Sequence, residues 1–307
     1  MGAVFYTFDH RQPRGEQLAR QTDDCLRCHA PRHVEGAPAH LVRSVYPDKQ
    51  GFPLLRNGSF FTDERSPFEE RWGGWYVTGK HPKMTHMGNE IAVAGEDHDE
   101  FSLDKTGGRE SLQDLVDLSR YLKPTSDVVA LMVMEHQAHL HNLITLANYQ
   151  TRLALHDEAV MDKAIDRSTE ELSPLTKRRI EHYGDKLVAA LIFRGEAKLP
   201  APVSSNAGFV EAFVNDGSKR DVEGRSLRDL NLEDRLFEHS LSFMINSKGF
   251  AGLPKELKDY VYKKLHAGMV GDDMSDVFMH VNAKQGRAVI TIMRSTHQGL
   301  PDYWFKD

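Results

Sequence analysis

The chain has 307 residues, 40% of them hydrophobic, so it is long enough to bury a large core in one domain or two. Its formal net charge is −6, and its lysines and arginines are scattered rather than clustered, which argues against nucleic acid as a partner. No stretch approaches the roughly 18 consecutive apolar residues of a membrane span, so we expect no transmembrane segment.

The first residues predict a β-strand at Val4-Phe5-Tyr6-Thr7-Phe8. This strand looks like an internal part of a domain rather than its start. They contain neither the basic region nor the apolar region with a small-residue cleavage site that an export signal would have. We therefore expect no export signal in this part of the chain.

The only two cysteines lie in Cys25-Leu26-Arg27-Cys28-His29, which is the C-x-x-C-H attachment sequence for c-type haem. Each cysteine sulfur would add to one vinyl group of the haem. Two intervening residues place both sulfurs on one side of a helical turn, and the residue that follows then lies under the iron. The spacing predicts one covalent haem c, with His29 as the proximal iron ligand.

Two other uses of the cysteines compete with haem attachment. A zinc site would combine Cys25 and Cys28 with two of His29, His33 and His40, but the spacing of these histidines is unusual for such a site. A thioredoxin-like redox pair would follow a hydrophobic strand, whereas residues 20–24 are polar.

The haem motif also predicts where the protein resides. Bacteria attach haem c covalently outside the cytoplasm, so the motif predicts a periplasmic or otherwise extracytoplasmic protein. Because the start of the chain lacks an export signal, we expect that a leader was removed or that the gene starts further upstream.

Residues 1–105 are rich in glycine, proline and aromatic residues, and they predict a haem-bearing region of short strands and loops. A hairpin is expected from strands at 40–46 and 52–55 around a turn at 47–51. A further strand is expected at 75–78. The polar segment 95–108, with its acidic run at 96–100, is expected to be a linker.

Residues 106–307 show helical periodicity and predict a mostly helical region that forms one continuous domain with the first. The expected fold is therefore mainly α with a smaller irregular or β N-terminal part, and the haem-bearing turn packs on the helical region. Helices are expected near 111–122, 127–155, 174–195, 207–215, 232–247, 254–268 and 283–296.

Candidates for the sixth iron ligand gather in residues 81–89, which contain two histidines and two methionines. We expect the ligand to be His86 or Met87. His136, on the predicted helix 127–155, is a further candidate, because it shares a helix face with His139 and an imidazole on a buried face could reach iron or a second metal.

Other side chains suit the surroundings of a haem. Arg43 and Arg71 are expected to bind its propionates, since a guanidinium fork matches a carboxylate. Trp75 is expected to form part of the haem pocket wall. If the sixth position were open, His86 could accept a proton from peroxide while Arg71 stabilises the developing charge.

Several segments of the chain stand out together: the haem motif, 40–47, 71–79, 86–89, 135–137, 224–229 and 300–304. With these segments the chain resembles a group of bacterial cytochrome c domain-containing proteins, and the similarity spans nearly the whole chain. The resemblance implies haem c binding and electron transfer in an exported protein.

These observations favour a monohaem c-type cytochrome that transfers electrons to or from a redox partner protein. A haem enzyme or sensor with an open or displaceable sixth position, peroxidase-like in its chemistry, is the first alternative. A zinc-stabilised structural protein is the second. Catalysis, the redox potential and the oligomeric state are left open by the sequence.

Overall fold

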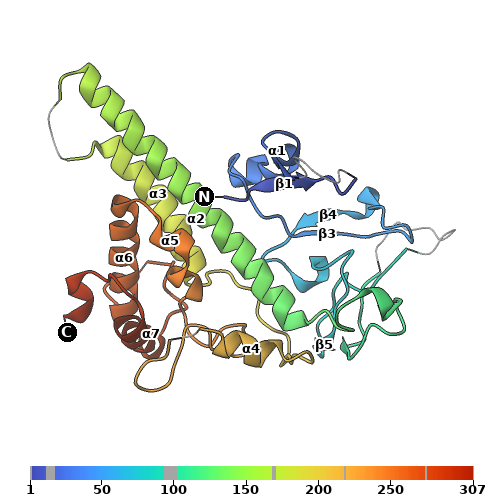
Figure 1. Ribbon diagram of the computed structural model, residues 1–307. Helices are drawn as coiled ribbons and strands as arrows, with labels where there is room; N and C mark the ends of the chain where they lie inside the picture. Colours follow the sequence, from blue (N-terminus) through green and yellow to red (C-terminus); the bar gives the residue numbers. More distant parts are fainter. Residues whose placement is uncertain are drawn as a thin grey trace.

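The computed structural model describes residues 2–11, 18–92, 102–167, 171–217, 219–273 and 275–306, without the side chain of His33. The protein is mainly helical, with small strand pairs in the N-terminal part, which confirms the expected fold class. Figure 1 shows the long helix α2 (Val128–Ala164) running between the N-terminal strands on one side and the C-terminal helices on the other.

The described strands form three separate antiparallel pairs. They are β1 (Phe5–Phe8) with β2 (Leu18–Gln21), β3 (Arg43–Val45) with β4 (Ser59–Phe61), and β5 (Gly79–Lys80) with β6 (Gly108–Arg109). The expected strand at 4–8 is thus confirmed. The short helix α1 (Asp24–His29) follows β2, and single 3-10 turns lie between the strands at η1 (Arg32–Val34), η2 (Leu55–Asn57) and η3 (Phe68–Glu70). A fourth turn, η4 (Leu118–Arg120), lies between β6 and α2.

The expected hairpin has its turn, and next to the turn its arms are joined by an isolated antiparallel bridge between Pro47 and Pro53 and by the Leu54 N–H, which donates to the Tyr46 carbonyl. The Asp48 carboxylate accepts the backbone N–H groups of Gln50 and Phe52 and so holds the turn. The arms do not form the expected longer strands, since β3 pairs with 59–61 rather than with 52–55. No strand forms at 75–78, because Trp75 and Val77 donate their backbone N–H groups to loop partners instead of a neighbouring strand.

The helical part is built on α2. Asp127 caps this helix, because its side chain accepts the N–H groups of Val129 and Ala130. The chain then turns back, and α3 (Pro174–Leu191) packs along α2 (Figure 1). The remaining elements are α4 (Phe209–Asn215), η5 (Phe243–Asn246), α5 (Lys248–Ala251), α6 (Lys255–Val270), α7 (Ala283–Thr296) and η6 (Asp302–Phe305).

Five of the seven expected helices are present, and two are not. Residues 111–122 contain only turns and η4, and residues 232–247 contain only turns and η5. In the second segment Leu236, Phe237 and Leu241 are all buried. Leu232 also has a positive φ of 63°, which a right-handed helix excludes. The expected linker at 95–108 lies partly outside the described residues, including its acidic run.

One hydrophobic core joins both parts of the chain. Trp72, Val77 and Met84 from the N-terminal part belong to the same buried cluster as the inner faces of α2, α3, α6 and α7. Among the helices that the structure describes, none is both long enough and apolar enough to cross a membrane, including the 37-residue α2.

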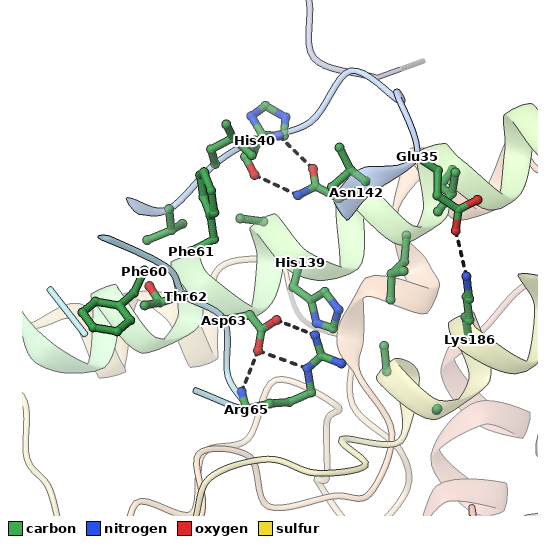
Figure 2. A pocket seen from close by; sticks show the side chains of 18 of the residues that line it. Glu35, His40, Phe60, Phe61, Thr62, Asp63, Arg65, His139, Asn142 and Lys186 are labelled. Atoms are coloured by element: carbon green, nitrogen blue, oxygen red, sulfur yellow. Dashed lines mark hydrogen bonds and ion pairs between the residues drawn. The ribbon is translucent and has the colours of Figure 1, made fainter. Parts of the chain in front are cut away.

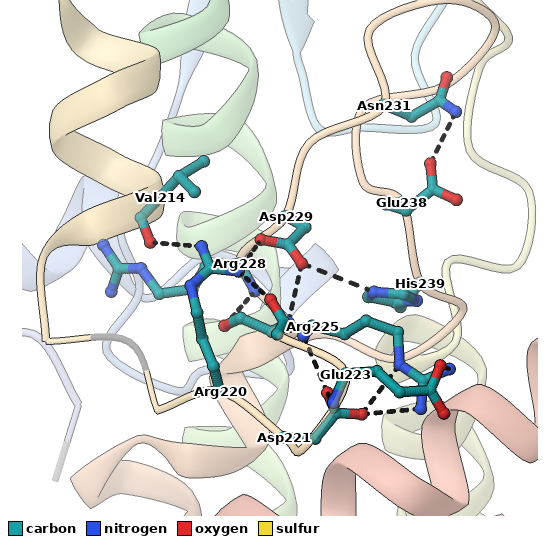
Figure 3. Close-up of polar contacts among 12 residues, drawn as sticks. Val214, Arg220, Asp221, Glu223, Arg225, Arg228, Asp229, Asn231, Glu238 and His239 are labelled. Atoms are coloured by element: carbon teal, nitrogen blue, oxygen red, sulfur yellow. Dashed lines mark hydrogen bonds and ion pairs between the residues drawn. The ribbon is translucent and has the colours of Figure 1, made fainter.

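A network of charged side chains holds the loop after α4. The Asp221 carboxylate accepts the backbone N–H groups of Glu223 and Arg225 and pairs with the Arg225 guanidinium at 2.7 Å. Asp229 accepts the backbone N–H of Ser226 and pairs with Arg220 (Figure 3). The segment 224–229 therefore has a structural role in this loop.

The ion pair between Arg71 and Glu135 connects the N-terminal part to α2. The Arg71 Nη1 and Glu135 Oε2 atoms are 3.0 Å apart, and the two side chains are 2% and 0% exposed. Arg71 also donates to the backbone carbonyls of Glu64 and Ser66, and Thr62 donates to the second oxygen of Glu135. The side-chain nitrogen atoms of Arg71 and the carboxylate oxygen atoms of Glu135 thus all have hydrogen-bond partners inside the protein.

Replacing Arg71 should destabilise the protein strongly. In an Arg71→Ala variant, Glu135 must either take up a proton or remain as an unpaired buried charge, and we expect a loss of about 3–5 kcal/mol in the free energy of unfolding. The matched variant Arg65→Ala breaks an ion pair whose arginine is 51% exposed and should cost less than about 1 kcal/mol. Denaturant titration checks both, and equal losses would contradict this account.

Candidate functional site

The haem motif forms the short helix α1. Cys25 is partly buried, Cys28 is exposed, and both thiols are free. His29 is the last residue of α1, and its backbone carbonyl accepts the N–H of Ala39 at 2.8 Å. The ring of Phe5, from strand β1, lies 4.5 Å from the His29 ring. The motif is therefore held against two other segments of the chain.

The His29 ring is oriented by a backbone carbonyl. Its Nδ1 lies 3.2 Å from the carbonyl oxygen of the fully buried Ala39. A carbonyl oxygen only accepts, so Nδ1 carries the proton and donates it, and Nε2 is left with its lone pair. Metal-binding histidines commonly have their second nitrogen fixed in this way. His29 is thus prepared to bind a metal ion through Nε2.

A cavity of about 500 Å³ lies beside His29. Its volume falls in the range of about 300–1,000 Å³ that small-molecule and cofactor sites occupy. Three apolar side chains, Leu41, Val42 and Trp75, line it from the N-terminal part. The other lining residues are His40 and, from α2 and η5, Met134, Gln137, Ala138, His141 and Met244.

Two histidines face each other on the wall of this cavity. The His40 and His141 rings are 4.9 Å apart and meet edge to face. Asn142 holds the backbone of His40 through two hydrogen bonds of 2.8 Å, one to its N–H and one to its carbonyl oxygen (Figure 2). Burial lowers the pKa of His141, and the neighbouring His40 lowers it further. His141 therefore favours the neutral form that can bind a metal ion.

His86 and Met87, the expected sixth ligands, lie elsewhere. Neither lines the cavity that contains His29. The His86 Nε2 is 3.5 Å from that of His81, and its ring packs on Trp72 at 5.2 Å. The Met87 sulfur accepts the hydroxyl of Ser44 at 3.6 Å. Both side chains are fully buried, so this segment acts as packing in the structure.

The backbone of residues 86–89 is bonded to the tryptophan-rich segment 71–77. Met87 donates its N–H to the Arg71 carbonyl, and Asn89 exchanges two side-chain hydrogen bonds with the backbone of Val77. A Cβ atom at Gly88 would lie 2.5 Å from the Val77 side chain, so only glycine allows this approach. The two segments thus form one packed pair of loops.

The residues expected around the propionates are only partly near the cavity. Trp75 lines it and donates its indole N–H to the carbonyl of Arg43 at 3.0 Å. The exposed Arg43 side chain bonds Ser59 instead of lining the cavity. Arg71 has no N–H directed at the cavity, because its nitrogen atoms bond Glu135 and the two carbonyls named above.

His136, on α2, belongs to a second buried polar cluster, together with Glu64, His139 and Ser242. Its Nε2 lies 2.7 Å from the Ser242 hydroxyl, and its Nδ1 faces Glu64 Oε1 at 3.7 Å. His139 Nδ1 lies 2.8 Å from the same oxygen. Burial acts to raise the pKa of Glu64, but the two imidazoles outweigh it and hold the pKa well below its usual range. Sequence analysis missed Glu64, because no spacing pattern connects it to α2.

This cluster borders a larger cavity of about 780 Å³ (Figure 2). Asp63, Arg65 and His139 line the cavity next to the cluster. His40, Leu41, Val42 and Ala138 line both cavities, so the two cavities adjoin. Glu196, in the segment after α3, adds a further carboxyl group near Glu64, and burial raises the pKa of Glu196 to about 7.

Comparisons with models of known protein families, with curated proteins and with solved structures each found no match.

The pair His81 and His86 should make stability depend on pH. Burial lowers the pKa of His86 from 6.5 to about 4, with His81 adding to the effect. Between these values the unfolded chain binds the proton and the folded chain does not, so stability should fall as the pH drops from about 6.5 to about 4. The contribution of His86 should reach about 3 kcal/mol.

The free energy of unfolding of the protein and of a His86→Gln variant should be measured across this pH range. We expect the loss at acidic pH to be smaller in the variant. Identical pH dependence in the two proteins would contradict the assignment to His86.

Proposed function

We propose that the protein is a c-type cytochrome with one haem bound through Cys25, Cys28 and His29. The observation that carries the proposal is the orientation of His29: its Nδ1 bonds the Ala39 carbonyl, and its Nε2 is free to bind iron. The two thiols one turn back on α1 are free and at least partly accessible, as thioether formation requires. A bound haem would supply a one-electron redox couple.

The cavity beside His29 supports the proposal by its size and by its apolar walls. Leu41, Val42 and Trp75 would contact the macrocycle and exclude water from it, which favours a defined redox potential. The backbone carbonyl of Arg43 accepts the indole N–H of Trp75. Of Arg43 and Arg71, we propose Arg43 as the residue that binds a propionate, since Arg71 is paired with Glu135.

We propose His141 as the sixth ligand in place of His86 or Met87. It lines the same cavity as His29, lies on the rigid helix α2, and favours the neutral form. Two histidine ligands give the haem iron a low reduction potential, which suits an electron carrier at the reducing end of the range of haem potentials. Met134 and Met244 line the same cavity and would instead raise the potential.

Electron transfer with a redox partner protein is the activity that we propose. Covalent haem attachment then places the protein in the bacterial periplasm or otherwise outside the cytoplasm. A peroxidase-like function with His86 and Arg71 is less well supported, because both side chains are buried and bonded to other groups. A zinc site at the cysteines is also less well supported, since within the described part of the chain Cys25 and Cys28 do not gather with two further ligands.

Haem attachment is tested by expressing the chain behind an export leader in cells that contain the haem c maturation machinery. We expect a band that keeps its haem stain on a denaturing gel, because a thioether survives denaturation. The Cys25→Ala/Cys28→Ala double variant should lose the stain. A folded, colourless wild-type protein would overturn the proposal.

The sixth ligand is tested by absorption and electron paramagnetic resonance spectra of the ferric protein. His141→Ala should convert a low-spin spectrum to a high-spin one that responds to added cyanide. The matched variants His86→Gln and Met87→Leu, which keep side-chain volume, should leave the spectrum unchanged. A spectrum that changes in either of these variants but not in His141→Ala would contradict the choice of His141.

A further inference from the structure

Glu64 is a buried carboxylate for which the described residues offer no cationic partner other than imidazole. Its side chain is 4% exposed, and its Oε2 has no hydrogen-bond partner. A buried negative charge of this kind is costly unless a cation neutralises it. Arg71 bonds only the backbone carbonyl of Glu64 and directs its charge at Glu135.

His136 points an unused nitrogen at the same carboxylate. The residue is fully buried, and its Nδ1 has no hydrogen-bond partner, since 3.7 Å from Glu64 Oε1 is too long for one. The Ser242 hydroxyl accepts the backbone N–H of Met244 and lies 2.7 Å from His136 Nε2, so it can donate to Nε2 and leave the ring proton on Nδ1. His136 thus faces Glu64 but leaves its Oε2 without a partner.

The remaining donors are close enough to share one ion. His139 Nδ1 lies 2.8 Å from Glu64 Oε1, and donor atoms of Asp63, Glu64 and His139 all lie within 4.8 Å of one another. His136 and His139 are three residues apart on α2 and therefore lie on one face of the helix. The Glu64 backbone is fixed independently, because its carbonyl accepts from Arg71 and from the N–H of Ala197.

We propose that Asp63, Glu64 and His139 bind a divalent transition-metal ion, with His136 beside them. One imidazole and two carboxylates form a ligand set that suits ions such as Zn²⁺ or Fe²⁺ and leaves coordination positions open. Those positions face the cavity of about 780 Å³ that His139 and Asp63 line, so a small ligand can reach the ion. Ser242 fixes the His136 ring from the other side.

The site shares no residue with the haem motif, and it stands whether or not haem is attached. The cavity that it borders shares His40, Leu41, Val42 and Ala138 with the cavity beside His29. With haem bound in the neighbouring cavity, the protein would hold two metal centres side by side.

Zinc is the probe of choice, because it does not change oxidation state and is distinguished from haem iron by elemental analysis. Full-length protein, stripped with a chelator and dialysed against Zn²⁺, should retain about one zinc ion per chain. His139→Ala, at the edge of the cavity, and Glu64→Gln should lose it. His156→Ala, an exposed histidine further along α2, is the matched control and should keep it.

The Cys25→Ala/Cys28→Ala variant separates this site from zinc binding at the cysteines and should also keep the ion. Circular dichroism establishes that each variant is folded, and His139→Ala, whose histidine is 12% exposed, decides the question if Glu64→Gln does not fold. The proposal is overturned if the wild-type protein retains no zinc. It is equally overturned if zinc is lost with the cysteines and kept in folded His139→Ala.

Discussion

The ion pair between Arg71 and Glu135 is the contact on which the other features of this structure depend. A guanidinium and a carboxylate that are almost completely excluded from water are stable only if each is fully paired. That requirement fixes the loop at 62–71 against α2, since Thr62, Glu64 and Ser66 supply the remaining partners. The N-terminal part and the helical part are therefore held in one defined arrangement.

Helix α2 presents different chemistry at successive positions because of this arrangement. Glu135 faces the ion pair, His136 and His139 face Glu64, and His141 faces the cavity beside His29. On a helix, residues three or four apart lie on one face, whereas residues one or two apart lie on different faces. These side chains therefore reach two neighbouring cavities. The proposed haem site and the proposed metal site thus use the same rigid element, which keeps their spacing constant.

Local patterns in the sequence predicted local structure well. The helical periodicity of residues 127–155 and 174–195 predicted the two long helices, and the C-x-x-C-H spacing predicted a helical turn that ends at His29. The helix expected at 232–247 failed, because its apolar residues are buried on several sides rather than along one face. Tertiary contacts decided the backbone there.

The functional sites required contacts that sequence spacing does not encode. His86 and Met87 have suitable chemistry and a suitable distance from the motif along the chain, yet their backbone is bonded to residues 71–77 and their side chains are used for packing. Glu64 lies 72 positions or more before its histidine partners, and nothing in its own surroundings marks it as a ligand. The roles of Ala39 and Ser242 are carried by a carbonyl and a hydroxyl, which leave no motif.

The most direct measurement is anomalous diffraction at the iron absorption edge, from crystals of protein made with the haem c maturation machinery. The account predicts an iron signal beside His29, in the cavity lined by Leu41, Val42 and Trp75, with density continuous to Cys25 and Cys28. Crystals of the same protein with no iron beside His29 would contradict it.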